Sequence, residues 1–295
     1  MGVVLSELSK KTLLVSDGAW GTMLQTAGLP SGVAPELWNV DEPAKVTAVA
    51  KAYFDAGSDM VLTNTFGGSR AKLEKVGLGD QVARLNAAGA RNSLAAKDEA
   101  LVAGSVGPTG EFLEPLGLMT EQQMEAIFAE QIGAMVEAGL RAVCVETMTA
   151  PEEAACAVRA AKTIDADVDV ISTFTFDPTP HGYKTMMGTS PADAVAMVIE
   201  AGADIVGANC GTGMDAMVEI AAALRAATDK PILIHANAGM PELVEGETVF
   251  KQGPDEMASH VEALIGAGAN IIGGCCGTTP DHIAAIRAKV DAARG

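Results

Sequence analysis

The chain has 295 residues, 48% of them hydrophobic, and its 38 acidic against 20 basic residues give a net charge of −18. This length suits one domain with a large core, since a single α/β barrel runs to about 250 residues. The acidic balance argues against nucleic acid and against an anionic membrane surface as partners, because both are bound through Lys and Arg. No stretch approaches the roughly 20 apolar residues of a membrane span.

The amino-terminal segment, Met1–Asp17, carries charged residues inside its only apolar region, which is not typical of a signal peptide. Five cysteines are too few for a disulfide scaffold. Cys275 and Cys276 are adjacent, an arrangement that two disulfide partners cannot easily adopt. We therefore expect metal binding or redox chemistry of these thiols, and a cytoplasmic location.

A short unit recurs along the chain, in which an amphipathic helix ends in Ala-Gly, two residues follow, and an apolar strand begins. The glycine can adopt the left-handed conformation that ends a helix, so that the chain turns back to the sheet. Strands that are apolar on both faces are typical of a parallel sheet covered by helices. The Ala-Gly pairs are Ala56-Gly57, Ala138-Gly139, Ala201-Gly202 and Ala267-Gly268.

Intervals of 63 and 66 residues separate the last three of these glycines. Each interval corresponds to two βα units of about 30 residues, so a further strand belongs in each. In chain order, the predicted strands are Thr12–Asp17, Met60–Asn64, Leu101–Val106, Ala142–Glu146, Val168–Phe174, Ile205–Cys210, Pro231–Ala236 and Ile271–Cys276. Eight βα units predict an α/β fold, a single (βα)8 TIM barrel over residues 1–295. The alternative is an open doubly wound sheet, but the segment Asp17–Thr22 lacks the spacing of its Gly-rich phosphate turn.

The active site of such a barrel lies at the rim formed by the C-terminal ends of the strands. Three of the five cysteines, Cys210, Cys275 and Cys276, end predicted strands there. Three thiolates with an open fourth position suit a catalytic Zn²⁺ ion. The alternative is that they are buried core residues, as we expect for Cys144 in a strand and Cys156 in a helix. The common rim placement favours the metal site.

Two other features of the rim have plainer interpretations. His235 stands near a strand end, and we interpret it as a hydrogen-bonded structural histidine. The segment Pro178–Tyr183 is rich in Pro and Gly and is predicted to be a loop, and the sequence leaves open whether it covers the site.

Several segments together resemble the homocysteine S-methyltransferase family, from about Leu13 to about Ile286. Within that family, the similarity is greatest to the homocysteine-binding barrel of the cobalamin-dependent methionine synthases. The double-cysteine segment is highly specific, whereas the first Asp-Gly segment alone would be weak. The segments are Asp17–Thr22, Thr63–Gly67, Gly107–Gly110, Gly207–Cys210 and Gly273–Pro280.

The resemblance implies that the three rim cysteines are the zinc thiolates of the family. It also implies that Asp17 and Glu146 hold the amino group of homocysteine, a role that suits two carboxylates. The alternative is that these two residues cap helices or pair with cations on the rim. The backbone amides of Gly18 and Ala19, together with Thr65, match the groups around the substrate carboxylate, and amides in such a turn can form an anion-binding nest.

The reaction implied by the resemblance is methyl transfer to the thiol of homocysteine, giving methionine. Zn²⁺ would deprotonate the thiol, and the thiolate would displace a methyl group from its donor. We expect the donor to be a methylated corrinoid (methylcobalamin) protein acting as a separate subunit. Alternatives are betaine or S-methylmethionine as donor, or a corrinoid-linked demethylase component with another thiol acceptor. A non-catalytic zinc-binding protein is a further alternative.

Overall fold

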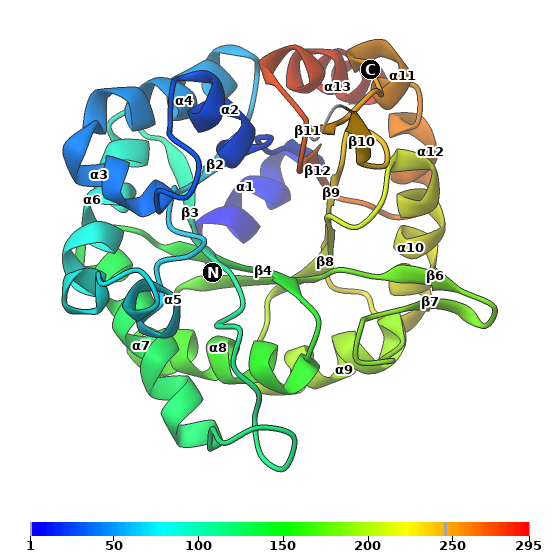
Figure 1. Cartoon of the computed structure of the whole chain (residues 1–295). Coiled ribbons are helices and arrows are strands. Elements are labelled where there is room, and N and C mark those ends of the chain that lie inside the picture. The colour runs from blue at the N-terminus through cyan, green and yellow to red at the C-terminus, as the bar shows by residue number, and fades with distance from the viewer. Residues whose placement is uncertain (1, 245–246, 295) are drawn as a thin grey trace.

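The computed structural model describes residues 2–244 and 247–294, and its central feature is a nearly closed barrel of eight parallel strands (Figure 1). The strands are β1 (Leu14–Val15), β2 (Met60–Leu62), β3 (Leu101–Val106), β4 (Ala142–Met148), β5 (Asp169–Phe174), β8 (Ile205–Asn209), β9 (Ile232–Ala236) and β12 (Ile271–Gly274). They pair in the order β2-β3-β4-β5-β8-β9-β12-β1. The predicted barrel is confirmed, and its strands are buried on both faces.

Helices form a ring around this barrel, as Figure 1 shows, and the main apolar core lies between them and the strands. The helices that precede β2, β4, β8 and β12 end at the four predicted Ala-Gly pairs, where the glycines have φ between 100° and 115°. Among the described residues, no helix is both long and apolar enough to cross a membrane. The helices are α1 (Val3–Lys11), α2 (Trp20–Thr26), α3 (Trp38–Asp41), α4 (Pro43–Asp55), α5 (Arg70–Glu74), α6 (Val82–Leu94), α7 (Glu121–Glu137), α8 (Pro151–Ile164), α9 (Pro191–Ala201), α10 (Met214–Ala227), α11 (Pro254–Ala258), α12 (Val261–Gly266) and α13 (Pro280–Arg294), with short 3-10 helices at Pro35–Leu37 and Gly79–Gln81.

The seam between β1 and β2 is closed largely by two aspartate side chains. The amide of Asp59 donates to the carbonyl of Val15 (2.7 Å), and the amide of Val15 donates back to the Asp59 carboxylate (2.9 Å). Further along, the amide of Leu62 donates to Oδ2 of Asp17 (2.7 Å). The first strand, Leu14–Val15, is shorter than the predicted Thr12–Asp17, and only these two residues pair with β12.

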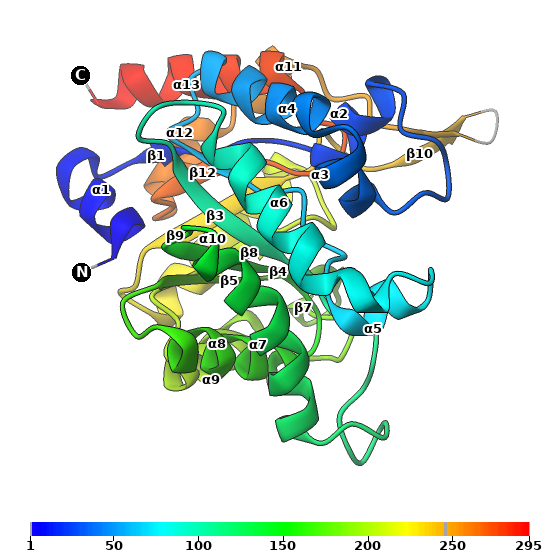
Figure 2. The ribbon, with the colours of Figure 1, turned by 90° about the vertical axis from the view of Figure 1, so that its left-hand side faces the viewer.

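Helix α1 fills the N-terminal end of the barrel, the end opposite the β10 label in Figure 2. Its Val4 and Leu8 pack in the barrel interior against apolar residues from every strand. The Asp169 carboxylate accepts hydrogen bonds from the amides of Val4 (2.6 Å) and Leu5 (3.1 Å), so a residue of β5 caps this helix. No pattern in the sequence predicts this helix. The polar ends of the strands lie together at the opposite end of the barrel.

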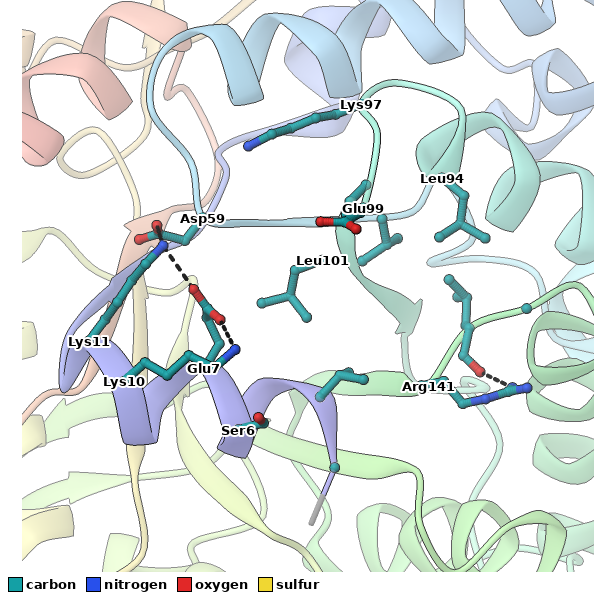
Figure 3. A pocket seen from close by; sticks show the side chains of 16 residues that line it. Ser6, Glu7, Lys10, Lys11, Asp59, Leu94, Lys97, Glu99, Leu101 and Arg141 are labelled. Carbon is teal, nitrogen blue, oxygen red and sulfur yellow. Dashed lines mark hydrogen bonds and ion pairs between the residues drawn. The ribbon is translucent and has the colours of Figure 1, made fainter.

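A hollow of about 580 Å³ lies beside α1, and Figure 3 shows the charged side chains around it. Lys11 Nζ lies 2.8 Å from the Asp59 carboxylate and 2.9 Å from that of Glu7. Arg141, on the other side of the hollow, donates to the carbonyl of Leu140 (2.8 Å). The Lys11–Asp59 pair thus adds a contact between α1 and the beginning of β2.

Two short hairpins extend from the barrel, β6 (Asp177–Thr179) with β7 (Gly182–Lys184), and β10 (Glu242–Val244) with β11 (Glu247–Val249). The first replaces the loop predicted for Pro178–Tyr183. A two-stranded hairpin tolerates Pro on its edge, and Gly182 has the left-handed φ of 88° that its turn requires. The Tyr183 hydroxyl lies 3.1 Å from the Glu219 carboxylate on α10, so this hairpin contacts an outer helix.

Candidate metal and substrate site

A cavity of about 470 Å³ lies at the C-terminal ends of the strands, where the barrel fold predicts an active site. Its wall is formed by residues at the ends of six strands, by the segment that follows β1, by Ala34–Glu36 and by residues in and after α5. The lining residues discussed below are Gly18, Ala19, Ser105, Glu146, Thr147, Cys210, His235, Cys275 and Cys276.

The three predicted cysteines converge in this cavity. The sulfur atoms of Cys210, Cys275 and Cys276 all lie within 4.8 Å of one another, and those of Cys210 and Cys276 are 3.9 Å apart. Cys210 follows β8 and has a left-handed φ of 62°, and the two other cysteines follow β12. Cys144 and Cys156 are buried, as expected.

The thiol cluster fits a zinc ion. A tetrahedral zinc site with Zn–S bonds of about 2.3 Å places its sulfurs about 3.8 Å apart. Hydrogen bonds from Cys275 and Cys276 lower the pKa of Cys210 to about 3, so Cys210 is the thiolate of the cluster. The pKa values of Cys275 and Cys276 are raised, because each donates a hydrogen bond to that thiolate and lies next to its negative charge. Ionising all three sulfurs together therefore needs a cation. Among the described residues, the buried Asn237 beside Cys210 has an Oδ1 atom without a hydrogen-bond partner.

Glu146 places a carboxylate on the same cavity wall. It lies in β4, is 8% exposed, and forms a short hydrogen bond with the Ser105 hydroxyl. The pKa of Glu146 is raised to about 7, mainly by burial and also by the charge of Asp17, while the hydrogen bond from Ser105 lowers it in part. A buried carboxylate of this kind gains stability when a cation such as an ammonium group approaches.

Asp17 lies behind this wall. It is 1% exposed, and its Oδ2 accepts hydrogen bonds from Trp20 Nε1 (2.8 Å) and from the amide of Leu62. Its Oδ1 accepts a weaker hydrogen bond from the Ser16 hydroxyl (3.2 Å). Burial raises the pKa of Asp17 to about 6, so both carboxylates are charged only above about pH 7, the pKa of Glu146.

The groups expected around a substrate carboxylate are only partly available. Gly18 and Ala19 line the cavity, but the Ala19 amide already donates to the Thr278 hydroxyl (3.0 Å). Thr65 is fully buried, and its hydroxyl donates to the carbonyl of Ser105 (2.7 Å) in the barrel wall. The contact expected from Thr65 with a substrate carboxylate therefore stays a prediction.

His235 differs from its interpretation as a hydrogen-bonded structural histidine. It lines the cavity, and its buried Nε2 has no hydrogen-bond partner among the described residues. Burial lowers the pKa of His235 to about 3, which keeps the imidazole neutral. The sequence places Asn209 and Asn237 at strand ends on the rim but indicates no role for them, and it does not single out Ser105. The only sequence signal for them is a polar side chain at the end of an apolar strand.

The fold is thus a (βα)8 barrel with three converging thiols and a buried carboxylate in one cavity at its rim, a candidate metal and substrate site. The sequence model of the homocysteine S-methyltransferase family matches residues 14–290. The chain therefore belongs to the homocysteine S-methyltransferase family.

Curated relatives include two methionine synthases and a betaine-dependent enzyme. The methionine synthase of Mycobacterium leprae (strain TN) is 32% identical over 97% of this chain, and that of Mycobacterium tuberculosis (strain ATCC 25618 / H37Rv) is 30% identical over 97%. The chain spans 25% of the length of each. Betaine–homocysteine S-methyltransferase 1 of Danio rerio is 28% identical over 99% of this chain and 76% of its own.

Among solved structures, the metallated form of the homocysteine methyltransferase MmuM from Escherichia coli superposes with a TM-score of 0.80 at 24% identity. The match covers 96% of this chain and 98% of that chain. The apo form of the same protein gives a TM-score of 0.75. These similarities confirm the barrel fold.

Proposed function

We propose that this protein is a zinc-dependent enzyme that transfers a methyl group to the thiol of homocysteine, giving methionine. The observation that carries the proposal is the convergence of three cysteine sulfurs and the Glu146 carboxylate on one cavity. Thiolates are ligands for zinc, and a buried carboxylate is a partner for the ammonium group of an amino acid. An amino acid that carries a thiol has both a sulfur ligand for the metal and an ammonium group for the carboxylate.

Each residue has a defined task in this proposal. Cys210, Cys275 and Cys276 would hold Zn²⁺, which supplies a Lewis acid that lowers the pKa of the substrate thiol. Glu146 binds the substrate ammonium, and the nearby charge of Asp17 strengthens that attraction. Gly18 lines the cavity and is the remaining backbone candidate for the substrate carboxylate, since Ala19 and Thr65 are engaged elsewhere.

For the methyl donor, we propose a methylated corrinoid protein acting as a separate subunit. The support is the similarity to two methionine synthases. Betaine is the second candidate, because a betaine–homocysteine S-methyltransferase is 28% identical over most of both chains. The cytoplasmic location expected from the cysteine usage stays a prediction.

The test is a methyl-transfer assay on zinc-loaded protein with homocysteine and one donor at a time. The donors are methylcobalamin, betaine and S-methylmethionine, and methionine is the product measured. We expect methionine from methylcobalamin, and its loss in Cys210→Ala. Cys156→Ala removes a buried cysteine outside the cavity and is the matched control. Methionine formed by Cys210→Ala at the full rate would contradict the metal role, and methionine from betaine alone would replace the corrinoid donor.

A further inference from the structure

Asn209 links two parts of the site that belong to different strands. It is the last residue of β8, it is fully buried, and it directly precedes Cys210. Its Nδ2 donates to the Thr147 hydroxyl (2.7 Å), and its Oδ1 accepts from the Thr147 amide (2.7 Å). A backbone amide can only donate, so these two bonds fix the orientation of the Asn209 side chain.

Thr147 adopts a backbone conformation that is unusual for a threonine. Its φ is 60°, in the left-handed region that β-branched residues rarely enter. Val145 pairs with Ser172 and Met148 with Phe174, so the register of β4 against β5 shifts between them. Glu146 and Thr147 thus stand opposite the single residue Thr173, an arrangement that defines a β-bulge.

The side-chain amide of Asn209 bonds to both strands of this bulge, β4 and β5. Besides its two bonds to Thr147, its Oδ1 accepts a hydrogen bond from the hydroxyl of Thr173 (2.7 Å), the residue opposite the bulge. A bulge re-aims the side chains beside it, and here the neighbouring side chain is Glu146, whose carboxylate lines the cavity. The bulge therefore sets where that carboxylate lies.

The same side chain reaches the thiol cluster. Nδ2 of Asn209 lies 3.9 Å from Sγ of Cys275, and the backbone of Asn209 leads directly into Cys210 with its left-handed φ of 62°. The buried amide of Asn209 thus contacts the end of β4, which carries Glu146, and also lies near Cys275 at the end of β12.

We propose that Asn209 is a positioning residue that holds the Glu146–Thr147 bulge, so that Glu146 meets the ammonium group of a substrate whose thiol lies at the cysteine cluster. This inference rests on the proposed function, because it takes homocysteine as the ligand. It predicts that loss of Asn209 weakens recognition of the substrate amine more than binding of its thiol.

The test compares two ligands that differ only in the amine. Homocysteine carries the ammonium group, and 4-mercaptobutanoate has the same thiol and carboxylate without it. Dissociation constants of both are measured by calorimetry on zinc-loaded protein, and their ratio reports recognition of the amine. If wild-type protein binds both equally, or neither, the proposed function fails before Asn209 is tested.

In Asn209→Ala we expect the zinc content to stay near wild type and the preference for homocysteine to fall by about tenfold. Glycine adopts a φ of 60° without strain, so adding Thr147→Gly to Asn209→Ala should restore most of that preference. The control Asn270→Ala removes an amide that accepts from the Ile232 amide (3.0 Å) at the other end of the barrel, and it should leave the preference unchanged.

Equal weakening of both ligands in Asn209→Ala would overturn the proposal, since Asn209 would then act on the thiol site alone. Failure of Thr147→Gly to restore the preference would overturn the role of the bulge. If Asn209→Ala does not fold, Thr147→Val is used instead. It removes the hydrogen bond between the Thr147 hydroxyl and Asn209 Nδ2 and keeps the shape of the side chain. It should lower the preference for homocysteine, and an unchanged preference there would overturn the proposal.

Discussion

The sulfur atoms of Cys210 and Cys276 lie 3.9 Å apart, although the two residues are 66 positions apart in the chain. They meet because β8 and β12 both pair with β9 in a parallel barrel, so their C-terminal ends face one cavity. Hydrogen bonds within the cluster leave one sulfur charged and two protonated in the metal-free protein, since the pKa of Cys210 is lowered and those of Cys275 and Cys276 are raised.

Zinc binding should therefore release about two protons per chain at pH 7, because all three ligands must be thiolates in the complex. Calorimetry in buffers of different ionisation enthalpy measures this number. Cys276→Ala removes one protonated ligand and should release about one proton while binding zinc more weakly. Release of three protons by the wild-type protein would contradict the charged state of Cys210.

Replacing Glu146 should make the metal-free protein more stable at neutral and alkaline pH. Burial raises the pKa of Glu146 from 4.5 to about 7, so the charged form opposes folding once the pH exceeds 4.5, and fully so above pH 7. Glu146→Gln should raise the free energy of unfolding at pH 8 by up to about 3 kcal/mol, and leave it unchanged at pH 4.

Urea unfolding of metal-free protein at both pH values measures this difference. Glu152→Gln, an exposed substitution on α8, is the matched control and should change neither value. The same Glu146→Gln protein should bind homocysteine more weakly, because the ammonium group loses its charged partner. A stabilised protein with unchanged homocysteine affinity would separate Glu146 from the substrate.

The affinity for homocysteine should fall as the pH is lowered from 8 to 6. The ammonium group requires charged carboxylates, and the pKa values are about 7 for Glu146 and about 6 for Asp17. Below its pKa, each group that must ionise weakens binding by about tenfold per pH unit. Titrations with 4-mercaptobutanoate share the pH dependence of the thiol but lack the ammonium, so the ratio of the two affinities isolates the carboxylates. A ratio that does not change with pH would contradict this role.

Loss of the Asp169 carboxylate should destabilise the protein without affecting the site. Asp169 caps α1 at the opposite end of the barrel, and loss of a helix cap costs about 1 to 2 kcal/mol. Urea unfolding of Asp169→Ala measures the cost, with the exposed Asp167→Ala as the control. Homocysteine affinity should remain at the wild-type value, and a large loss of affinity would show that α1 supports the site.

Most of the barrel could be predicted from the sequence, because its Ala-Gly helix ends and apolar strands are local signals. The four glycines do adopt the left-handed conformation, and the strands that follow them are buried. Helix α1 was missed because its role depends on a distant partner, Asp169, which no local pattern indicates. The sequence predicts a loop where the hairpin at Pro178–Tyr183 lies, because short exposed strands lack an apolar pattern.

For the site, the sequence placed residues at strand ends but could not give the direction of their side chains. The cysteines lie together as predicted, since a position at the rim was enough to bring them near one another. Thr65 turns into the barrel wall, and Asp17 lies behind the cavity. The bulge at Glu146–Thr147 depends on an amide from another strand, so the sequence of β4 alone does not indicate it.

The aspartates at the seam of β1 and β2 affect how mutational data on this protein should be interpreted. Asp17 binds the Leu62 amide and Asp59 binds the Val15 amide, yet only Asp17 lies near the cavity. In a survey of growth after random mutation, both positions would tolerate few replacements, and intolerance alone would label both as catalytic. Measurements of protein abundance would separate the two positions only in part. Replacing Asp17 should lower abundance as well, because its carboxylate both closes the barrel at Leu62 and contributes negative charge beside Glu146.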